Sequence, residues 1–428
     1  MSKPDIEWEK IFDKYDILKQ IERDGFFNIS AAQIKKFREP RLMVKFDHAI
    51  NLPQIFKNND LAILPITRGD YVISTFDLYH KLENENSKIT KFSLPDNLQS
   101  LDPNKITSET MALNCALASG IISDFMGEGE NNIFATVSGR MSSGKFTFNI
   151  KDIKSNSLRH INVNNSQIEI DAAYEGISSL ALVEAKMDLS DDFLVRQLYY
   201  PFRTWQPRIR KKVKSIFLIY TNGIFKLFEY AFDDFNNYSS LRLIQQKNYS
   251  IEDTVISLSD IEEVLYNTAI IEEPKGIPFP QADKFERVIN LCELVTAQSL
   301  TSTDVTDTYD FNIRQTNYYT DAARYLGLLE KNKDGRKPVY SISQQGRQIL
   351  NLGFKQRQLS FCKKILSHNA FNNSLRLYLK KSVCPSNDEI IEIMRQSGLD
   401  NIAHSTFKRR ASSIRGWLNW IISLINDN

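Results

Sequence analysis

The spacing of apolar positions changes repeatedly along the middle of the chain. Apolar residues three and four apart indicate helices, whereas alternating or short continuous apolar runs indicate strands. On this basis we expect a helix over 106–130, strands over 132–140, 145–150, 166–176 and 180–188, a helix over 191–205, and a hairpin over 215–232 that turns at Asn222-Gly223. This order of elements predicts a mixed α/β core built on one central sheet.

The segments on either side of this core have patterns of their own. Residues 1–100 combine helical stretches with a hairpin signal at Arg68-Gly69-Asp70, which predicts a mixed α/β module. The stretch 272–285 holds three prolines and one glycine and is the best linker candidate. Beyond it, three helical stretches and a charged hairpin follow the order of a winged helix, and the last segment repeats the helical theme without a clear wing.

The fold class that follows is α/β (α+β) and multidomain. A central mixed β-sheet flanked by helices is followed by C-terminal winged-helix or helix-turn-helix domains. We expect four domains, at 1–100, 101–272, 285–355 and 356–428. The basic residues of the first module could touch DNA, or they could form an ordinary solvated surface.

Composition and charge narrow the class of protein. With 428 residues, 42% of them hydrophobic, the chain is long enough for several packed domains, so global disorder is not expected. From Phe285 to the end there are twenty Lys and Arg against thirteen Asp and Glu. This part therefore has a net charge of +7. Because the whole chain has a net charge of +2, the preceding part has a net charge of −5. A basic C-terminal third suits a polyanionic partner.

The cysteines and the apolar runs indicate in which cellular compartment the protein is expected. None of the four cysteines lies in a CxxC pair and the five histidines are scattered, so neither a structural zinc site nor a disulfide framework is expected. No apolar signal core opens the chain and no run approaches twenty apolar residues. We therefore expect a reduced, cytoplasmic protein without a membrane span.

Charged residues interrupt the two neighbouring strands at 166–176 and 180–188. Because strand side chains alternate between faces, Glu184 and Lys186 share one face, and Glu169 and Asp171 share another. A turn at Glu175-Gly176 would pair the strands and bring these four groups together at a solvent-open sheet end. Carboxylates placed close together repel, and a divalent cation would offset that repulsion. A neighbouring lysine could orient or deprotonate a water, or stabilise the charge that develops on a phosphorane.

This arrangement resembles the PD-(D/E)XK nuclease superfamily over roughly residues 105–235. The matching residues are IEID, which ends in Asp171, and VEAK, which contains Glu184-x-Lys186. Ile170 stands where the family name has proline. The resemblance implies a Mg²⁺ site held by Asp171 and Glu184, with Glu169 and Glu109 as further acids. It also implies catalytic roles for Asp171, Glu184, Lys186 and Gln197, the last of these on the following helix.

More ordinary explanations of these residues stay open. Glu184 and Lys186 could be an ion pair at an exposed strand end. Glu169 could be simply solvated, and Glu109 could be solvated or a helix-capping residue.

Three stretches carry side chains suited to DNA. The run RTWQPRIRKKVK (203–214) has six basic residues and no acid, so it would hold phosphates in a salt-dependent manner unless it is only a solvated loop. Its candidate contacts are Arg203, Arg208, Arg210, Lys211 and Lys212. The expected recognition helix and wing contribute Arg314, Gln315, Asn317, Tyr318, Arg336 and Lys337. The last segment contributes Lys408, Arg409 and Arg410. A protein-binding winged helix is the alternative for both C-terminal modules.

These features together predict a metal-dependent, sequence-specific DNA endonuclease similar to a type II restriction enzyme. No GxxxxGK[ST] motif is present, which disfavours ATP-driven enzymes. The expected partners are double-stranded DNA, a second copy of the chain, because one site cuts one strand, and a cognate DNA methyltransferase. The alternatives are a repair or mobile-element nuclease, and a DNA-binding regulator whose nuclease-like domain is inactive.

Overall fold

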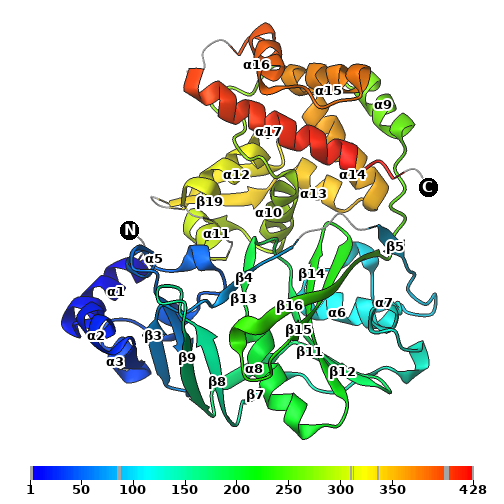
Figure 1. Ribbon diagram of the computed structural model, residues 1–428. Coiled ribbons are helices and arrows are strands. Elements are labelled where there is room, and N and C mark those ends of the chain that lie inside the picture. The colour runs from blue at the N-terminus through cyan, green and yellow to red at the C-terminus, as the bar shows by residue number, and fades with distance from the viewer. Residues whose placement is uncertain are drawn as a thin grey trace. The chain divides into compact units, whose positions relative to one another are not determined.

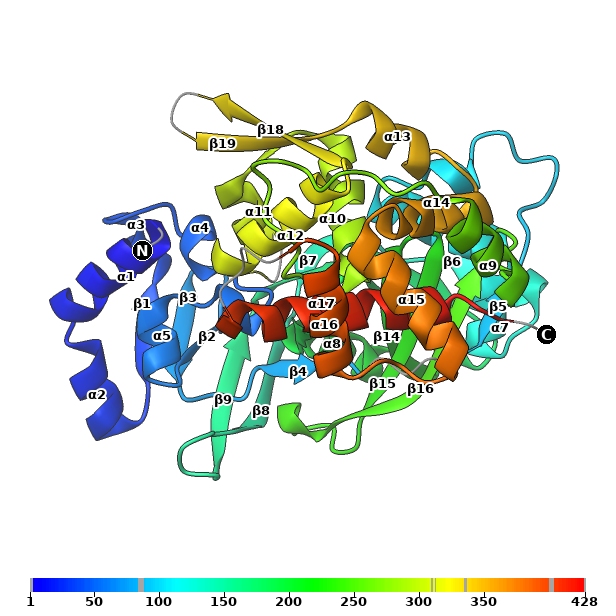
Figure 2. The same cartoon turned by 90° about the horizontal axis from the view of Figure 1, so that it is seen from above.

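The computed structural model describes residues 3–83, 88–308, 311, 313–334, 337–399 and 404–426. The chain divides into two compact units, which Figures 1 and 2 show from two directions. The first unit comprises Met1–Lys88, Ala112–Ile219 and Phe225–Asn248, and the second comprises Ile89–Met111, Tyr220–Ile224 and Tyr249–Asn428. Residues 1–88, most of the module that we expected at the N-terminus, fall in the same compact unit as most of the central segment.

The first part of the first unit is a small α/β layer. Its elements are α1 (Lys3–Lys14), α2 (Ile17–Asp24), β1 (Phe27–Ser30), α3 (Ala31–Lys35), α4 (Arg41–Val44), α5 (Gln54–Asn58), β2 (Ala62–Pro65), β3 (Asp70–Ser74) and β4 (Tyr79–Lys81). β2 and β3 form the antiparallel hairpin expected around Gly69, in the strand order β1-β3-β2. The aromatic rings of Trp8, Phe12 and Phe56 pack edge to face in its core.

The central sheet follows in the same unit. Its elements, with the helices and strands around them, are α6 (Glu109–Ala118), α7 (Ile121–Met126), β6 (Phe134–Ala135), β7 (Gly139–Ser142), β8 (Lys145–Lys151), β9 (Leu158–Asn164), β10 (Gln167–Ile170), β11 (Ala172–Glu175), β12 (Ser179–Lys186), β13 (Asp192–Leu194), α8 (Arg196–Trp205), β14 (Lys212–Thr221), β15 (Ile224–Phe232) and β16 (Leu241–Ser250). The strands run in the order β16-β15-β14-β12-β11-β6. β12 pairs parallel with β14 and antiparallel with β11, so the sheet is mixed, as expected.

Four of the expected elements differ from the structure. The strand expected over 132–140 is two strands, since β6 pairs with β11 and β7 with β10. The helix expected over 106–130 is two helices, because Gly120 adopts a left-handed conformation (φ 84°) between α6 and α7. The strand expected over 166–176 is two strands, since β10 pairs with β7 and β11 with β12. The segment 191–205 begins as strand β13 before α8 starts. The hairpin at Asn222-Gly223 is present, with both residues at positive φ, as a tight turn requires.

The second unit is mostly helical. Its elements are β5 (Ile89–Lys91), α9 (Leu258–Asn267), α10 (Phe285–Ala297), β17 (Leu300–Thr301), α11 (Ser302–Thr308), α12 (Ile313–Tyr325), β18 (Leu329–Asp334), β19 (Lys337–Ile342), α13 (Gln344–Leu350), α14 (Phe354–Leu366), α15 (Asn369–Lys381), α16 (Asn387–Gln396) and α17 (His404–Ser423). β17, β19 and β18 form a small antiparallel sheet in that order. Phe285 of α10 packs against Phe361 of α14 and Trp417 and Trp420 of α17. One hydrophobic core therefore runs through both segments that we expected to be separate domains.

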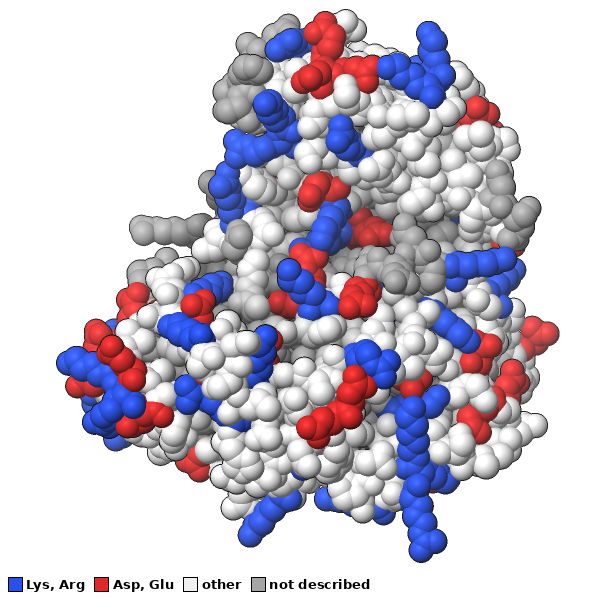
Figure 3. All heavy atoms as spheres, in the orientation of Figure 1, with Lys and Arg blue, Asp and Glu red and all other residues white. Residues whose placement is uncertain are grey.

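The molecule is thus a mixed α/β protein with a multi-strand mixed sheet. Among the residues described, no helix combines the length and the apolar character needed to cross a membrane. Basic and acidic side chains are interspersed over the face shown in Figure 3, which does not present one continuous basic surface.

Candidate active site

Asp171 stands at a break between two strands. β10 pairs with β7, whereas β11 begins directly after Asp171 and pairs with β12. The register of that second pairing carries Asp171 to the level of Glu184, and Oδ2 of Asp171 accepts a hydrogen bond of 2.8 Å from the Ala185 backbone N–H. The change of strand partner therefore fixes the aspartate beside the strand that carries the Glu-x-Lys sequence.

Glu184 and Lys186 share one face of β12 and form an ion pair, with Nζ of the lysine 2.6 Å from Oε1 of the glutamate. Glu184 is only 7% exposed, and the Lys186 side chain is 15% exposed. The solvent-open face that we expected is therefore wrong. β12 pairs with β11 and β14 at its two edges, α8 packs on it, and every residue from Ser179 to Ala185 is buried, so both faces of the strand are covered.

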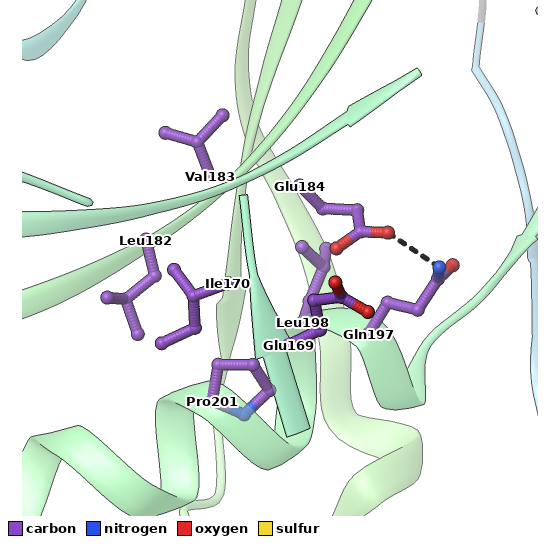
Figure 4. Close-up of a pocket in the computed structure, with 8 residues that line it drawn as sticks. All are labelled: Glu169, Ile170, Leu182, Val183, Glu184, Gln197, Leu198 and Pro201. Atoms are coloured by element: carbon purple, nitrogen blue, oxygen red, sulfur yellow. Dashed lines mark hydrogen bonds between the residues drawn. The ribbon is translucent and has the colours of Figure 1, made fainter. Parts of the chain in front are cut away.

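Gln197 completes the group from the first turn of α8. Its Nε2 donates to Oε1 of Glu184 at 2.6 Å (Figure 4). Lys186 contacts the same oxygen. The other amide atom of Gln197, Oε1, is buried and has no hydrogen-bond partner among the described residues. A buried acceptor without a partner costs free energy, so this atom marks a position where a ligand or a water would be stabilised.

Burial controls the protonation of both carboxylates. It raises the pKa of Glu184 to about 7, against the opposing pull of the Lys186 ammonium group, and the nearby Asp171 adds repulsion in the same direction as burial. Burial also raises the pKa of Asp171, although the Ala185 N–H and Lys186 favour its anion. Two carboxylates that are both destabilised as anions indicate a place where added positive charge would be stabilising.

The two further acids of the expected metal site have different positions. Glu169, on β10, lines the same small pocket as Glu184 and Gln197, and its side chain lies beside theirs in Figure 4. It is about half exposed and pairs with Arg140 on β7 at 3.2 Å. Glu109 is the first residue of α6 and is not among the residues that line this pocket.

The carboxylates at this site suit a cation that needs few protein ligands. Within the described part of the chain, no group of three or more His, Cys, Asp or Glu side chains is arranged to hold a metal ion. The site instead offers the buried Glu184 and the partly buried Asp171, with Glu169 at its edge. Mg²⁺ is commonly held by one or two carboxylates, with waters and substrate phosphates completing its octahedron, so this pair is compatible with Mg²⁺.

A histidine and two aspartates beside the site were missed by the sequence analysis. Nδ1 of His48 lies 2.7 Å from the backbone oxygen of Asp192, and its Nε2 lies 3.5 Å from Oδ2 of Asp188, two residues beyond Lys186. Although burial alone would raise the pKa of Asp188, His48 and Lys186 hold it below its usual value. No motif marks His48, because it lies about 140 residues before its partners in the sequence.

Arg203 is not available to DNA, and that prediction is wrong. Its side chain is buried, its Nη1 donates to the Tyr199 hydroxyl and to the Phe235 backbone oxygen, and its guanidinium lies 4.0 Å from the centre of the Phe235 ring. The residue belongs to α8, whose buried face holds it inside the unit. Arg203 is therefore a packing residue.

The rest of the basic run is closer to the surface. Arg208 and Arg210 are exposed, and Arg208 lies over the Trp205 ring. Lys211 is partly exposed and donates to Glu175 at 2.7 Å, whereas the more exposed Lys212 is 3.8 Å from Glu229. Arg208 and Arg210 are thus the residues of this run best placed to meet a polyanion.

The C-terminal candidates lie on two helices of the second unit. On α12, Arg314 and Asn317 are exposed and Gln315 and Tyr318 are partly exposed, and the guanidinium of Arg314 lies over the Tyr318 ring. On α17, Lys408 and Arg409 are exposed and Arg410 is partly buried. Arg336 lies outside the described residues, as does the side chain of Lys337.

Three families match successive parts of the chain, and each is described as a domain of unknown function. They are DUF6996 over residues 5–73, DUF6997 over 74–250 and DUF7226 over 287–426. The second match contains Asp171, Glu184, Lys186 and Gln197, and the third spans both C-terminal segments that share one core. Neither the curated proteins nor the solved structures contain a match to this chain.

Proposed function

We propose that this chain is a Mg²⁺-dependent DNA endonuclease that hydrolyses phosphodiester bonds, of the kind found in the PD-(D/E)XK superfamily. The observation that carries the proposal is the convergence of Asp171, Lys186 and Gln197 on Glu184 inside the sheet. Lys186 and Gln197 contact the same oxygen of Glu184, while Asp171 is fixed by the next backbone N–H. An ion pair at a solvated strand end would not require this burial.

Asp171 and Glu184 would hold the cation, and Glu169 would act at the edge of the pocket. A bound Mg²⁺ would supply Lewis acidity toward a phosphate oxygen and would lower the pKa of a water. The raised pKa values of the two carboxylates favour this assignment, because a cation would remove the cost of holding them as anions in a buried site.

Lys186 and Gln197 would act on the reacting groups. Once a cation takes over the charge of Glu184, the Lys186 ammonium group can turn toward a phosphate oxygen and stabilise the charge that builds up on it. Gln197 would hold the Glu184 carboxylate in place through Nε2, and its Oε1, which lacks a partner, can accept a hydrogen bond from a water.

The second unit would read the DNA sequence. The order α10-β17-α11-α12-β18-β19, with a three-stranded sheet, is that of a winged helix, in which α12 would be the recognition helix. Its exposed Arg314 and Asn317 are of the types that pair with guanine and adenine edges. The helices α16 and α17 would add contacts through Lys408 and Arg409. A cutting site with a dedicated reader is the organisation of a type II restriction enzyme, acting as a homodimer and protected by a cognate DNA methyltransferase.

One observation favours a second candidate, a DNA-binding regulator with an inactive nuclease-like domain. Glu184 is already neutralised by Lys186, and no group of three ligands is assembled among the described residues. In that case the pair would be a structural feature of the sheet, and the chain would bind DNA without cutting it.

The test is cleavage of a mixture of large duplex DNAs of diverse sequence, with and without Mg²⁺. We expect discrete fragments from the parent chain, and a loss of at least about 100-fold in rate for Asp171→Ala and Lys186→Ala. The matched controls are Asp124→Ala and Lys247→Ala, which remove the same residue types from an exposed ion pair of the same unit and should cut normally. Smeared products would indicate a repair or other nonspecific nuclease. Binding without any cutting would indicate the regulator.

A further inference from the structure

A two-stranded ribbon in the first unit stands apart from the rest of its strands. β8 and β9 form a two-stranded antiparallel sheet, from Lys145↔Asn164 to Lys151↔Leu158, and its edges bond to neighbouring segments through the Asn149 N–H to the Asn236 oxygen and the Asn164 N–H to the Ile66 oxygen. In this register one face of the ribbon carries Phe146, Phe148, Ile161 and Val163, which pack into the core of the unit. Phe148 packs against the Tyr199 ring at 5.2 Å, so the ribbon is fixed to the helix that carries Gln197.

The opposite face of the ribbon points to solvent and is polar. We call it the outer face, and it is formed by Lys145, Thr147, Asn149 and Lys151 on β8 and by Leu158, His160, Asn162 and Asn164 on β9. All of these are exposed except Asn149, which is partly exposed and bonds to His160 across the strands at 3.2 Å. Three asparagine amides therefore lie on this surface, which is polar except for Leu158.

The charge of the ribbon has one sign. Neither strand contains Asp or Glu, whereas Lys145, Lys151 and Arg159 are cationic. The carboxylate of the loop that joins the strands, Asp152, is fully buried and paired with Arg159. The outer face itself thus carries cations and neutral amides, and the carboxylate that lines a hollow together with His160 and Asn162, that of Asp24, is paired with Arg23.

These dimensions and this chemistry match one partner, the major groove of duplex DNA. A two-stranded β-ribbon fits that groove, and asparagine pairs in a bidentate manner with the N6 and N7 edge of adenine. Residues two apart on a strand are about 6.8 Å apart, which is about the height of two base-pair steps. Asn162 and Asn164 could therefore meet the edges of bases two steps apart. Asn162 makes no side-chain hydrogen bond within the described part of the chain, so its amide needs no rearrangement to bind.

We propose that the outer face of the β8–β9 ribbon is a second DNA-reading surface, which lies in the major groove and selects A·T pairs through Asn162 and Asn164. This inference rests on the proposed function but adds to it, since it gives the cutting unit its own sequence preference besides that of the second unit. Lys145, opposite Asn164, would hold a neighbouring phosphate or a guanine edge.

The test is selection of bound sequences by the full chain from a pool of random duplexes in EDTA, where no cation-dependent cutting takes place. We expect Asn162→Ala and Asn164→Ala each to lose the A·T preference at one position, with a loss of roughly 10-fold in affinity for the preferred sequence. Affinity for unrelated DNA should stay unchanged. Asn131→Ala, which removes an exposed asparagine of the same unit outside the ribbon, is the matched control and should alter neither quantity.

Each other outcome overturns the inference in a recognisable way. If the two variants enrich the same sequence as the parent chain, the ribbon reads no bases and the proposed nuclease is unaffected. If both variants weaken binding to every sequence equally, the ribbon contacts only phosphates. If the parent binds duplexes without enriching any sequence, there is no base readout at all. A parent that binds no duplex would refute the inference together with the proposed function.

Discussion

Glu184 and Lys186 form an ion pair inside the sheet, with 2.6 Å between Oε1 and Nζ, although each would ordinarily be excluded from a strand that is covered on both faces. Removing one partner of a buried pair leaves the other charge without compensation, which costs more than the pair itself contributes. If Lys186 is removed, the Glu184 carboxylate can take up a proton, because its pKa is already near neutrality. Protonation removes the buried charge and so reduces the loss of stability.

We therefore expect Lys186→Met to lower the free energy of unfolding of the first unit by about 2 kcal/mol at pH 8, and by less at pH 6. The measurement is chemical denaturation at both pH values. The double variant Glu184→Gln with Lys186→Met should recover most of the loss, because no charge is left buried. Lys247→Met, in an exposed pair with Asp124, should change stability by under about 0.5 kcal/mol. Equal losses in the two lysine variants would contradict this account.

The raised pKa of Glu184 predicts how the free energy of unfolding changes with pH. A carboxyl group whose pKa is higher in the folded state than in the unfolded state binds more protons when folded, between the ordinary value of 4.5 and about 7. Its contribution to stability is therefore fully present below 4.5 and is lost as the pH rises toward 7. The partly buried Asp171, whose pKa is also raised, acts in the same direction.

Glu184→Gln should remove this contribution. We expect the melting temperature of the parent chain to fall relative to that of the Gln variant as the pH rises from 5 to 7.5, by the equivalent of roughly 2 kcal/mol. Added Mg²⁺ should reduce the difference at pH 7.5, because a cation stabilises the anion of Glu184 in the parent and has less to bind in the variant. Parallel melting curves at all pH values would show that Glu184 titrates normally.

His48 gives a third prediction. Because Nδ1 donates to the Asp192 backbone oxygen, Nε2 can face the Asp188 carboxylate as a donor only when the ring is doubly protonated. His48→Phe would remove the ring that faces the partly buried Asp188 carboxylate, and we expect a loss of about 3 kcal/mol in unfolding free energy. Asp188→Asn in the same chain should restore part of that loss, and urea denaturation of the four proteins of this double-mutant cycle measures the coupling. Additive losses would mean that the two residues do not interact.

The sequence was sufficient to predict those features that depend on residues close together in the chain. The turn at Glu175-Gly176 and the hairpin at Asn222-Gly223 were predictable, since the residue types at those positions specify the turn. The meeting of Asp171 with Glu184 and Lys186 followed from strand alternation and a short connection. The partnership of Gln197 with Glu184 followed from the family resemblance.

What could not be predicted depends on contacts that are distant in the sequence. The buried state of Glu184 arises because α8 and β10 pack over its face of β12, and neither is visible in the alternation of β12 itself. His48 reaches Asp188 only because β4 pairs with β13 and brings the N-terminal segment to the end of β12. Arg203 was read as part of a basic run, but the helical period turns it inward, away from the charges that follow it.

The last prediction concerns Arg203 and Arg210. The two arginines belong to the same basic run in the sequence, but their surroundings in the structure differ. Arg203 is buried against the ring of Phe235, whereas Arg210 is exposed. We expect Arg203→Met to reduce stability by about 2 kcal/mol, through the lost hydrogen bonds and ring contact, and to leave the salt dependence of DNA binding unchanged. Arg210→Met should leave stability unchanged and reduce the slope of log K against log salt by about 1, as expected for one lost phosphate contact. Binding titrations from 50 to 200 mM salt, with melting curves on the same samples, measure both quantities. If Arg203→Met lowered the slope while the protein stayed fully folded, the guanidinium would have to leave its pocket to bind DNA, and the assignment of Arg203 to packing would be wrong.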